Sequence, residues 1–304
     1  MRPSLPFRLR YSPFLVQLVV TRRCNLACGY CFEYDDVSAP VPTETLERRI
    51  DKVAELGGFA VELTGGEPML HPDLFHLIKY AKETAKIYKV MMISNAYLFN
   101  EEAVHKLNDA GLQELQISID GVKPNDVTVK VLKPLRKKLE AVARVAKFKV
   151  VLSSVLGSSN VDETLEVVKF ARDNGFRPRC LILHDDHGQL QLKPEELGLY
   201  AQVKAAMGER FTEARDYRTQ LIRTGSAPFK CRSGSRYIYV DEFGNACWCS
   251  QTRDVWKKSF DTYTVADLRE QFDTPKTCAA TCTIGCSRTC AAYDEWRPQP
   301  GHAA

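Results

Sequence analysis

Three cysteines near the start of the chain have a spacing that suits iron–sulfur chemistry. Cys24, Cys28 and Cys31 are arranged as C-x3-C-x2-C, directly after an apolar run. Three thiolates this close together can hold three corners of a cubane cluster. A structural zinc site would need a fourth ligand, and none lies nearby in the sequence. One iron would then stay open to another ligand, so the cluster could do chemistry beyond carrying electrons.

A second group of cysteines lies towards the end of the chain. Its members are Cys231, Cys247, Cys249, Cys278, Cys282, Cys286 and Cys290. On a strand, Cys247 and Cys249 would share one face, so both thiols could point at metal. Seven cysteines can fill one four-ligand site with three left over, but they are one short of two sites. Cys180 stands alone: it is either a buried core thiol or a hydrogen donor or ligand.

The last four cysteines of this group repeat every four residues. On one continuous helix, Cys278 and Cys290 would lie roughly 18 Å apart at ~1.5 Å rise per residue, too far for a single cubane. Gly285 and the threonines of the segment also disfavour a regular helix. The threonines are Thr277, Thr281, Thr283 and Thr289. We therefore expect a loop that wraps around metal.

Composition limits the possible function classes. The chain has 304 residues, 44% of them hydrophobic and 26% charged, which is ordinary for a globular protein. A net charge of +4 is too weak to argue for nucleic acid or a membrane surface as a partner. The first apolar run is too short to span a membrane and has no cleavage site, so we expect a cytoplasmic protein with no membrane partner. Cytosolic thiols stay reduced, which favours metal or catalysis over disulfides for the eleven cysteines.

The elements that must position these cysteines alternate between strands and helices from residue 14 to residue 188. Strands are predicted at 14–20, 59–63, 89–93, 114–119, 149–155 and 179–184, and helices near 43–57, 72–85, 101–110, 133–147 and 161–174. Thr43 and Asn100 are the predicted N-caps, and Gly57, Gly111 and Gly175 the predicted C-caps. This α/β pattern predicts a parallel sheet with its ligands at the carboxyl ends of the strands.

The residues after 188 follow another pattern. Residues 193–224 read as helical, and a β-hairpin is predicted from 236–240 and a return strand through Cys247 and Cys249. A further helix is predicted at 265–272. We therefore divide the chain into an extension (1–13), an α/β domain (14–190), a helical connector (191–228) and a cysteine-rich domain (229–304).

Polar residues follow the predicted strands, and some of them have a familiar pattern. The cysteine loop with Tyr30, together with Gly65-Gly66-Glu67-Pro68 after the second strand, resembles the signature of the radical SAM superfamily. Ser94-Asn95 and Ser118-Ile119-Asp120-Gly121 resemble its polar strand ends. The resemblance covers residues 14 to about 188. It implies a partial (β/α)6 TIM-like barrel.

The same resemblance implies cofactors and residue roles. Cys24, Cys28 and Cys31 would hold a [4Fe–4S] cluster whose open iron binds S-adenosylmethionine (SAM). Residues 65–67 would contact the SAM amino group through backbone oxygens and the Glu67 carboxylate. Tyr30 would lie near the adenine, and Asn95, Ser118 and Asp120 near the carboxylate or ribose. Reduction of the cluster would cleave SAM to methionine and a 5′-deoxyadenosyl radical that abstracts hydrogen from a substrate.

The cysteine-rich segment has a resemblance of its own. Cys231-x12-Gly244-x4-Cys249 followed by clustered cysteines looks like the SPASM or twitch extension of radical SAM enzymes, which binds one or two auxiliary [4Fe–4S] clusters. Cys247 is extra to that pattern. The tail also departs from the usual C-x2-C-x5-C-x3-C spacing. One auxiliary cluster, two, or a structural zinc remain open.

We therefore expect a radical SAM oxidoreductase or maturase that uses flavodoxin or ferredoxin as reductant. A peptide or protein is the favoured substrate on family habit, although the thirteen residues before the first strand leave no room for a peptide-recognition domain. The alternatives are a small molecule (alcohol, sugar, nucleoside or lipid precursor) and a non-enzymatic electron carrier. His184, Asp185, Asp186 and His187 either contact substrate or form a solvated loop. Arg236, Tyr237 and Trp248 either line the substrate site or pack the hairpin.

Overall fold

The computed structural model describes residues 11–31, 34–185, 190, 197–208 and 216–294. Asp186 and His187, most of the predicted extension, and parts of the connector and the last segment lie outside these residues. Six parallel strands form the main sheet in the order β6-β5-β4-β3-β2-β1. They are β1 (Leu15–Thr21), β2 (Ala60–Gly65), β3 (Lys89–Ser94), β4 (Glu114–Ser118), β5 (Lys149–Leu156) and β6 (Arg177–Ile182). The predicted partial (β/α)6 barrel is confirmed.

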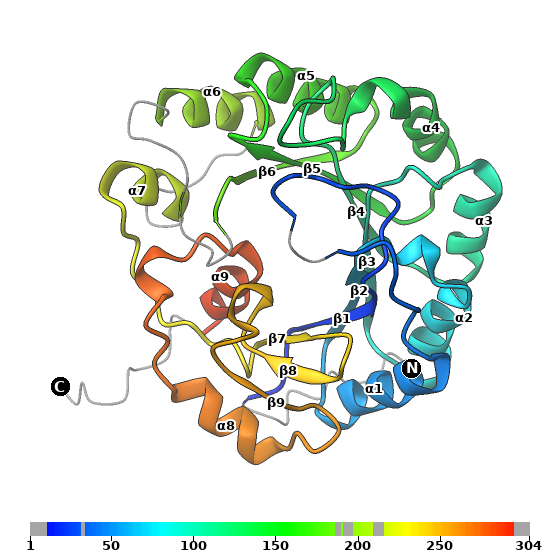
Figure 1. Ribbon diagram of the computed structural model, residues 1–304, viewed down its shortest axis with the longest axis vertical. Coiled ribbons are helices and arrows are strands. Elements are labelled where there is room, and N and C mark those ends of the chain that lie inside the picture. Colours follow the sequence, from blue (N-terminus) through cyan, green and yellow to red (C-terminus); the bar gives the residue numbers. More distant parts are fainter. Residues whose placement is uncertain (1–10, 32–33, 186–189, 191–196, 209–215, 295–304) are drawn as a thin grey trace.

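Helices cover the outer face of this curved sheet (Figure 1). They are α1 (Thr43–Glu55), α2 (Leu74–Lys79), α3 (Glu101–Asp109), α4 (Leu132–Val145) and α5 (Val161–Asp173). Alternation along β1 sends Val16, Leu18 and Val20 into the core beneath these helices. Each such buried side chain stabilises the fold by about 1.5–3 kcal/mol. Gln17, between them, faces the interior of the barrel, where the polar residues of the other strands gather.

The helix ends test the predicted caps. Asn100 accepts a hydrogen bond from the Ala103 N–H, as predicted, and the three predicted C-cap glycines have positive φ. The prediction for Thr43 is wrong: Pro42 occupies the N-cap position, and the Thr43 hydroxyl instead donates to Asp73 at 2.5 Å. The single helix predicted at 72–85 ends at Lys79 and continues as one π-helical turn, Tyr80–Thr84.

The predicted hairpin is present and extends the main sheet, but its return strand ends at Cys247 and does not reach Cys249. Strand β7 (Tyr237–Val240) pairs parallel to β1, and β8 (Asn245–Cys247) and β9 (Lys257–Ser259) follow antiparallel. The hairpin and the barrel therefore share one nine-stranded sheet. Gly244 in the turn has a φ of +88°, and a β-carbon there would lie 2.7 Å from the Arg49 guanidinium. The glycine of the family pattern thus has a structural reason.

The remaining helices lie at the two ends of the strand row and across the open side of the ring (Figure 1). They are α6 (Leu197–Met207), α7 (Tyr217–Thr224), α8 (Val265–Asp273) and α9 (Gly285–Ala292). The loop predicted for the last cysteines is wrong in its second half: a 3-10 turn spans Ala279–Thr281, and α9 carries Cys286 and Cys290 one turn apart. Helix α9 starts at Gly285, so this glycine does not interrupt it, and packing against the barrel interior outweighs the weak helix propensity of threonine. No helix in the described ranges is long and apolar enough to cross a bilayer.

For Arg236 and Trp248, lining the substrate site and packing the hairpin were both open, and packing is what the structure shows. The Arg236 guanidinium is buried, pairs with Asp294 at 2.7 Å and donates to the Ser12 carbonyl at 2.6 Å. It thereby joins the segment before β1 to the residues after α9. Trp248 stacks on Trp256 with their ring centroids 5.7 Å apart.

Candidate active site

The loop between β1 and α1 brings the first three cysteines together. Backbone hydrogen bonds from Cys24 to Asp35 (2.9 Å), from Cys31 to Cys28 (3.0 Å) and from Gly29 to Val127 (3.0 Å) fix its course. Burial raises the pKa of the Cys24 thiol, and the neighbouring charges of Glu67, Cys31 and Cys28 raise it further. A bound cation such as iron would relieve this mutual repulsion.

The two glycines after β2 lie directly against this loop. The Gly66 N–H donates to the Thr21 carbonyl at 2.8 Å, and the Glu67 N–H to the Arg23 carbonyl at 2.9 Å. A β-carbon on Gly65 would lie 2.0 Å from the Thr21 carbonyl oxygen, and one on Gly66 would lie 2.3 Å from that of Arg22. Glycine is therefore required for the backbones to approach. The sequence did not reveal that these glycines, besides their expected contact with SAM, let the end of β2 pack against the cysteine loop.

The Glu67 carboxylate ties the ends of β2 and β3 together. It is 0% exposed and accepts hydrogen bonds from the Asn95 N–H (2.7 Å), the Ser94 hydroxyl (2.8 Å) and the Met69 N–H (3.1 Å). Burial raises its pKa to about 7, although these hydrogen bonds oppose the shift. Pro68 follows as the first residue of a 3-10 turn. The motif at β2 and the polar end of β3 are thus one hydrogen-bonded unit.

Asn95 extends this unit to the first cysteine. Its amide Nδ2 lies 3.7 Å from Cys24 Sγ and donates to Asn25 Oδ1 at 2.9 Å. The first cysteine loop and the ends of β2 and β3 therefore meet at one point, as the parallel topology predicts.

A second polar unit lies on the other side of the loop, around Asp120. This carboxylate is 0% exposed, accepts hydrogen bonds from Tyr30 Oη and Thr128 Oγ1, both at 2.7 Å, and lies 3.5 Å from Lys130 Nζ. Its second oxygen, Oδ1, is buried without a partner in the described structure. Burial raises the pKa of Tyr30 well above its usual range, although Lys130 opposes this. Thr128 and Lys130 were not predicted because they lie in an irregular loop without a motif. Ser118, which was predicted, is the last residue of β4, the strand that precedes this loop.

The sequence of this region decides the family. Residues 18–186 match the profile described as "Radical SAM superfamily". The chain belongs to this superfamily. The PqqA peptide cyclase of Bradyrhizobium diazoefficiens is 30% identical over 53% of this chain and 44% of its own length. The GTP 3′,8-cyclase of Sulfurovum sp. is 34% identical over 55% and 53%. The chain thus spans about half the length of these curated relatives.

Solved structures support the fold. The Streptococcus suis SuiB structure bound to its precursor peptide SuiA superposes with a TM-score of 0.69, at 17% identity, over 88% of this chain and 66% of that one. The predicted resemblance to radical SAM enzymes with a cysteine-rich C-terminal extension is confirmed.

The donor groups fit the cofactors that the radical SAM superfamily implies, a [4Fe–4S] cluster and SAM. All eleven cysteines are free of disulfides, and Cys24, Cys28 and Cys31 would hold the cluster. The unpaired Asp120 Oδ1 is an acceptor to which a ligand hydroxyl would donate. The three cysteines and the polar unit around Asp120 are therefore suited to adjacent parts of one bound assembly.

Four of the seven C-terminal cysteines form a set that we call the four-cysteine group. They are Cys231, Cys249, Cys278 and Cys282, and Cys231 acts electrostatically on each of the other three. Burial is the first cause of the raised pKa of each of these three, about 12 for Cys282, and neighbouring thiols add to it. The Ile284 N–H donates to Cys282 Sγ at 3.3 Å. Four thiols are the donor set of a cubane cluster.

The other predicted ligands border this four-cysteine group: Cys247 and Cys290 pack in one cluster with Cys249, and Cys231 also acts electrostatically on Cys290. Cys286 and Cys290 lie on α9 towards the barrel interior, where Cys286 Sγ is 4.0 Å from Gln17 Nε2. Burial raises the pKa of Cys247 to about 12, and its strongest charged neighbours are Asp241 and Arg253. Among the residues with described positions, no three His, Cys, Asp or Glu side chains converge to hold a single metal ion.

Two further sequence predictions concern strand β6. Cys180 is 2% exposed and packs with Tyr200 and other apolar side chains between β6 and α6, so the core alternative is the one observed. His184 Nδ1 is hydrogen-bonded to the carbonyl of its neighbour Asp185 at 2.8 Å.

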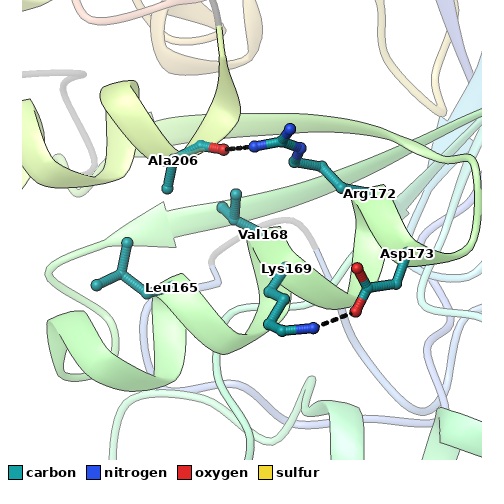
Figure 2. Close-up of a pocket in the computed structure, with 6 residues that line it drawn as sticks. All are labelled: Leu165, Val168, Lys169, Arg172, Asp173 and Ala206. Carbon is teal, nitrogen blue, oxygen red and sulfur yellow. Dashed lines mark hydrogen bonds and ion pairs between the residues drawn. The ribbon is translucent and has the colours of Figure 1, made fainter.

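A surface hollow of about 440 Å³ lies between the outer helices α5 and α6, where Val168 packs in the same cluster as Cys180 (Figure 2). Arg172 donates to the Ala206 carbonyl at 2.8 Å across it, and Lys169 pairs with Asp173 at its edge. Its lining residues belong to the outer helices, and none of them was predicted for the site. We assign it no role in the chemistry.

Proposed function

We propose that this chain is a radical SAM maturase that abstracts hydrogen from a peptide or protein substrate. One observation carries the proposal: the loop of Cys24, Cys28 and Cys31 lies against both polar units, Glu67 with Asn95 on one side and Tyr30 with Asp120 on the other. When bound, the cluster and SAM supply methionine and a 5′-deoxyadenosyl radical after one-electron reduction by flavodoxin or ferredoxin.

The residues of this chain hold and orient SAM in the proposed site. The backbone oxygens of Gly65 and Gly66 and the Glu67 carboxylate would receive the SAM amino group. Asn95, Ser118 and Asp120 would bind its carboxylate or ribose, and Tyr30 would lie beside its adenine. Because Glu67 and Asp120 are already fixed by hydrogen bonds, little rearrangement is needed on binding.

The four-cysteine group would hold one auxiliary [4Fe–4S] cluster. Such a cluster can take an electron from an oxidised substrate radical, which suits dehydrogenation or crosslinking. A second auxiliary cluster would need Cys286, Cys290, Cys247 and one more ligand. We favour one cluster because Cys231, Cys249, Cys278 and Cys282 supply a full set of four thiols, whereas Cys247, Cys286 and Cys290 supply only three.

A peptide substrate is supported by two of the similar proteins. SuiB is bound to a precursor peptide in its crystal structure, and the PqqA cyclase is named for a peptide. The GTP cyclase, which is similarly related, keeps a small-molecule substrate as the second candidate.

Anaerobic reconstitution followed by SAM and dithionite tests the activity. We expect 5′-deoxyadenosine and methionine in equal amounts from the wild type. A Cys24→Ala variant should form neither. If the reconstituted wild type forms no 5′-deoxyadenosine, the chain is an electron carrier and the enzyme proposal is wrong. If added peptides from neighbouring genes do not change the yield while small molecules do, the peptide assignment is wrong.

A further inference from the structure

Three hydrogen-bonding groups converge inside the barrel beside the first residue of α9. Arg179 Nη2, Arg218 Nη2 and Tyr217 Oη lie 3.0, 3.2 and 3.5 Å from the position that a β-carbon on Gly285 would occupy. They come from different elements: Arg179 from β6, and Tyr217 and Arg218 from the start of α7. Because residue 285 is glycine, no side chain of its own fills the place where these groups meet.

Two of these groups each have one buried polar atom without a hydrogen-bond partner in the described chain, although the Arg218 guanidinium is also hydrogen-bonded to Tyr200. The two atoms are Tyr217 Oη and Arg218 Nε, and Ser153 Oγ also has no partner among the described residues. Ser153 pairs with Arg179 in the β5–β6 register, so the two side chains share the inner face of the sheet. Buried donors without acceptors are costly, and an acceptor supplied by a ligand would satisfy them.

The charges around this place are mainly positive. Within the described chain, the groups acting most strongly on Arg218 are Tyr217, Tyr200 and Cys180, and none of these is a carboxylate. Arg288 adds a third guanidinium, 4.4 Å from the Tyr217 ring centre. Glu62 faces Arg179 and is itself held by Gln17 at 2.5 Å, and the Cys286 thiol is influenced by both Arg179 and Arg218.

Two fixed features complete the environment. Arg179 is oriented by a 2.8 Å hydrogen bond from its Nη1 to Gln116 Oε1 and by a hydrogen bond to the Cys286 thiol, and its Nη2 lies beside Gly285. Helix α9 begins at Gly285, so the positive end of its dipole lies at the same place. Both features favour a negatively charged oxygen ligand.

The position of this group relative to the SAM contacts is defined by the sheet register. Ser118 on β4 pairs with Ser153 on β5, which pairs with Arg179 on β6. These residues form one row across the inner face of the sheet. A molecule held at Arg179 would therefore lie two strands from Ser118, where we place SAM.

We propose that Arg179, Arg218 and Tyr217 form a receptor for an oxyanion group of the substrate, most simply a carboxylate. The proposal rests on the proposed function, since it names the chemical class of that substrate. In a peptide, the group would be an aspartate or glutamate side chain or the chain's own C-terminal carboxylate. Guanidinium groups bind carboxylates through paired N–H donors, and the tyrosine hydroxyl would add a third bond.

Anion binding to the SAM-bound holoenzyme tests the receptor without any turnover. Acetate is followed by saturation-transfer NMR and inorganic phosphate by ³¹P line broadening, at constant ionic strength and without reductant. We expect saturable binding to the wild type, weakened about threefold to tenfold in Tyr217→Phe and at least about tenfold in Arg218→Met. Tighter binding of acetate identifies a carboxylate substrate, and tighter binding of phosphate a phosphorylated one.

Matched variants separate this receptor from general charge and from unfolding. Arg223→Met removes an exposed arginine from the same helix and should bind both anions like the wild type. Tyr217→Phe deletes a hydroxyl that has no described partner, so its melting temperature should equal or exceed that of the wild type. Absence of saturable binding to the wild type, or equal affinity in the wild type and Tyr217→Phe, would overturn the proposal. Wild-type protein that binds acetate but forms no 5′-deoxyadenosine with dithionite would overturn only the proposed function.

Discussion

The two groups of cysteines are built in opposite ways. Cys24, Cys28 and Cys31 belong to one short loop, and the rest of the chain contributes only the hydrogen bonds that hold it. In the second group, Cys231 precedes β7, Cys249 follows β8, and Cys278 and Cys282 flank a 3-10 turn. The first site is local and depends on polar strand ends for its function, whereas the second exists only once the sheet and its hairpin have formed.

This difference has consequences for how each site fails. A local loop keeps its three thiols close even if distant packing weakens, so its sensitive feature is the chemistry of each residue. A site assembled from distant segments is sensitive to any ligand that ties those segments together. The predictions below test each half of this contrast.

The largest effect is expected from the first group. Cys24→Ala should reduce 5′-deoxyadenosine formation to the level of cluster-free protein and remove about four irons per chain, because no other cysteine of the described loop can replace it. Cys180→Ser is the matched control: that thiol packs between β6 and α6 and should leave iron content and cleavage unchanged. SAM cleavage that survives in Cys24→Ala would show that the ligand assignment is wrong.

Substitution of any one cysteine of the four-cysteine group should remove the auxiliary cluster. In a background lacking Cys24, Cys28 and Cys31, iron and sulfide analysis should give about four irons per chain for one auxiliary cluster. Cys282→Ala in that background should remove them, whereas Cys247→Ala should retain them. About eight irons would instead mean two clusters, and iron loss in Cys247→Ala would place that thiol among the ligands.

The pH dependence of SAM binding should reveal Glu67. Its pKa of about 7 means that the carboxylate is mostly ionised at pH 8 and mostly protonated at pH 6. Only the ionised form attracts the SAM amino group, so the Kd should rise roughly tenfold as the pH falls from 8 to 6. The control is Glu67→Gln, which has no carboxyl group to titrate at this position. Titration of the SAM amino group itself affects the Kd of both proteins equally. Equal pH slopes for the two proteins, measured anaerobically by calorimetry, would remove Glu67 from the SAM site.

The sequence predicted the barrel well because its signals are local. Strand and helix periodicity, Asn100 as a cap and the positive-φ glycines all act within a few residues. The first cysteine loop and Glu67 carry a compact motif, so they could be found as well. What the sequence could not show depends on distant contacts: the parallel pairing of β7 with β1, and the helical form of α9.

The same reasoning explains the residues that were missed at the site. Thr128 and Lys130 reach Asp120 from an irregular loop, and no periodicity or motif marks such positions. Arg179 and Tyr217 come together only because α9 enters the open side of the ring. Polar residues that come into contact only through tertiary packing have no characteristic spacing in the sequence, so their contact could not be predicted.

The smallest expected effect concerns one hydroxyl beside the four-cysteine group. Thr252 Oγ1 lies 3.5 Å from Cys249 Sγ and favours the thiolate form of that cysteine. A hydrogen bond to a ligating sulfur stabilises the reduced, more negative cluster. Thr252→Val should therefore make the auxiliary midpoint potential more negative by about 20 mV, equivalent to roughly 0.5 kcal/mol. Thr252→Ser keeps the hydroxyl and should keep the potential.

An EPR-monitored redox titration in the background without Cys24, Cys28 and Cys31 measures this shift free of the first cluster. The first site offers a contrast, because Thr128 Oγ1 is 4.0 Å from Cys28 Sγ and donates to Asp120 at 2.7 Å. Thr128→Val should accordingly weaken SAM binding without moving the potential of the first cluster. The opposite result would be that each valine variant shifts the midpoint potential of its own cluster and that neither changes SAM affinity. The two threonines would then have the same role, and the contrast between the local site and the assembled site would be wrong at these positions.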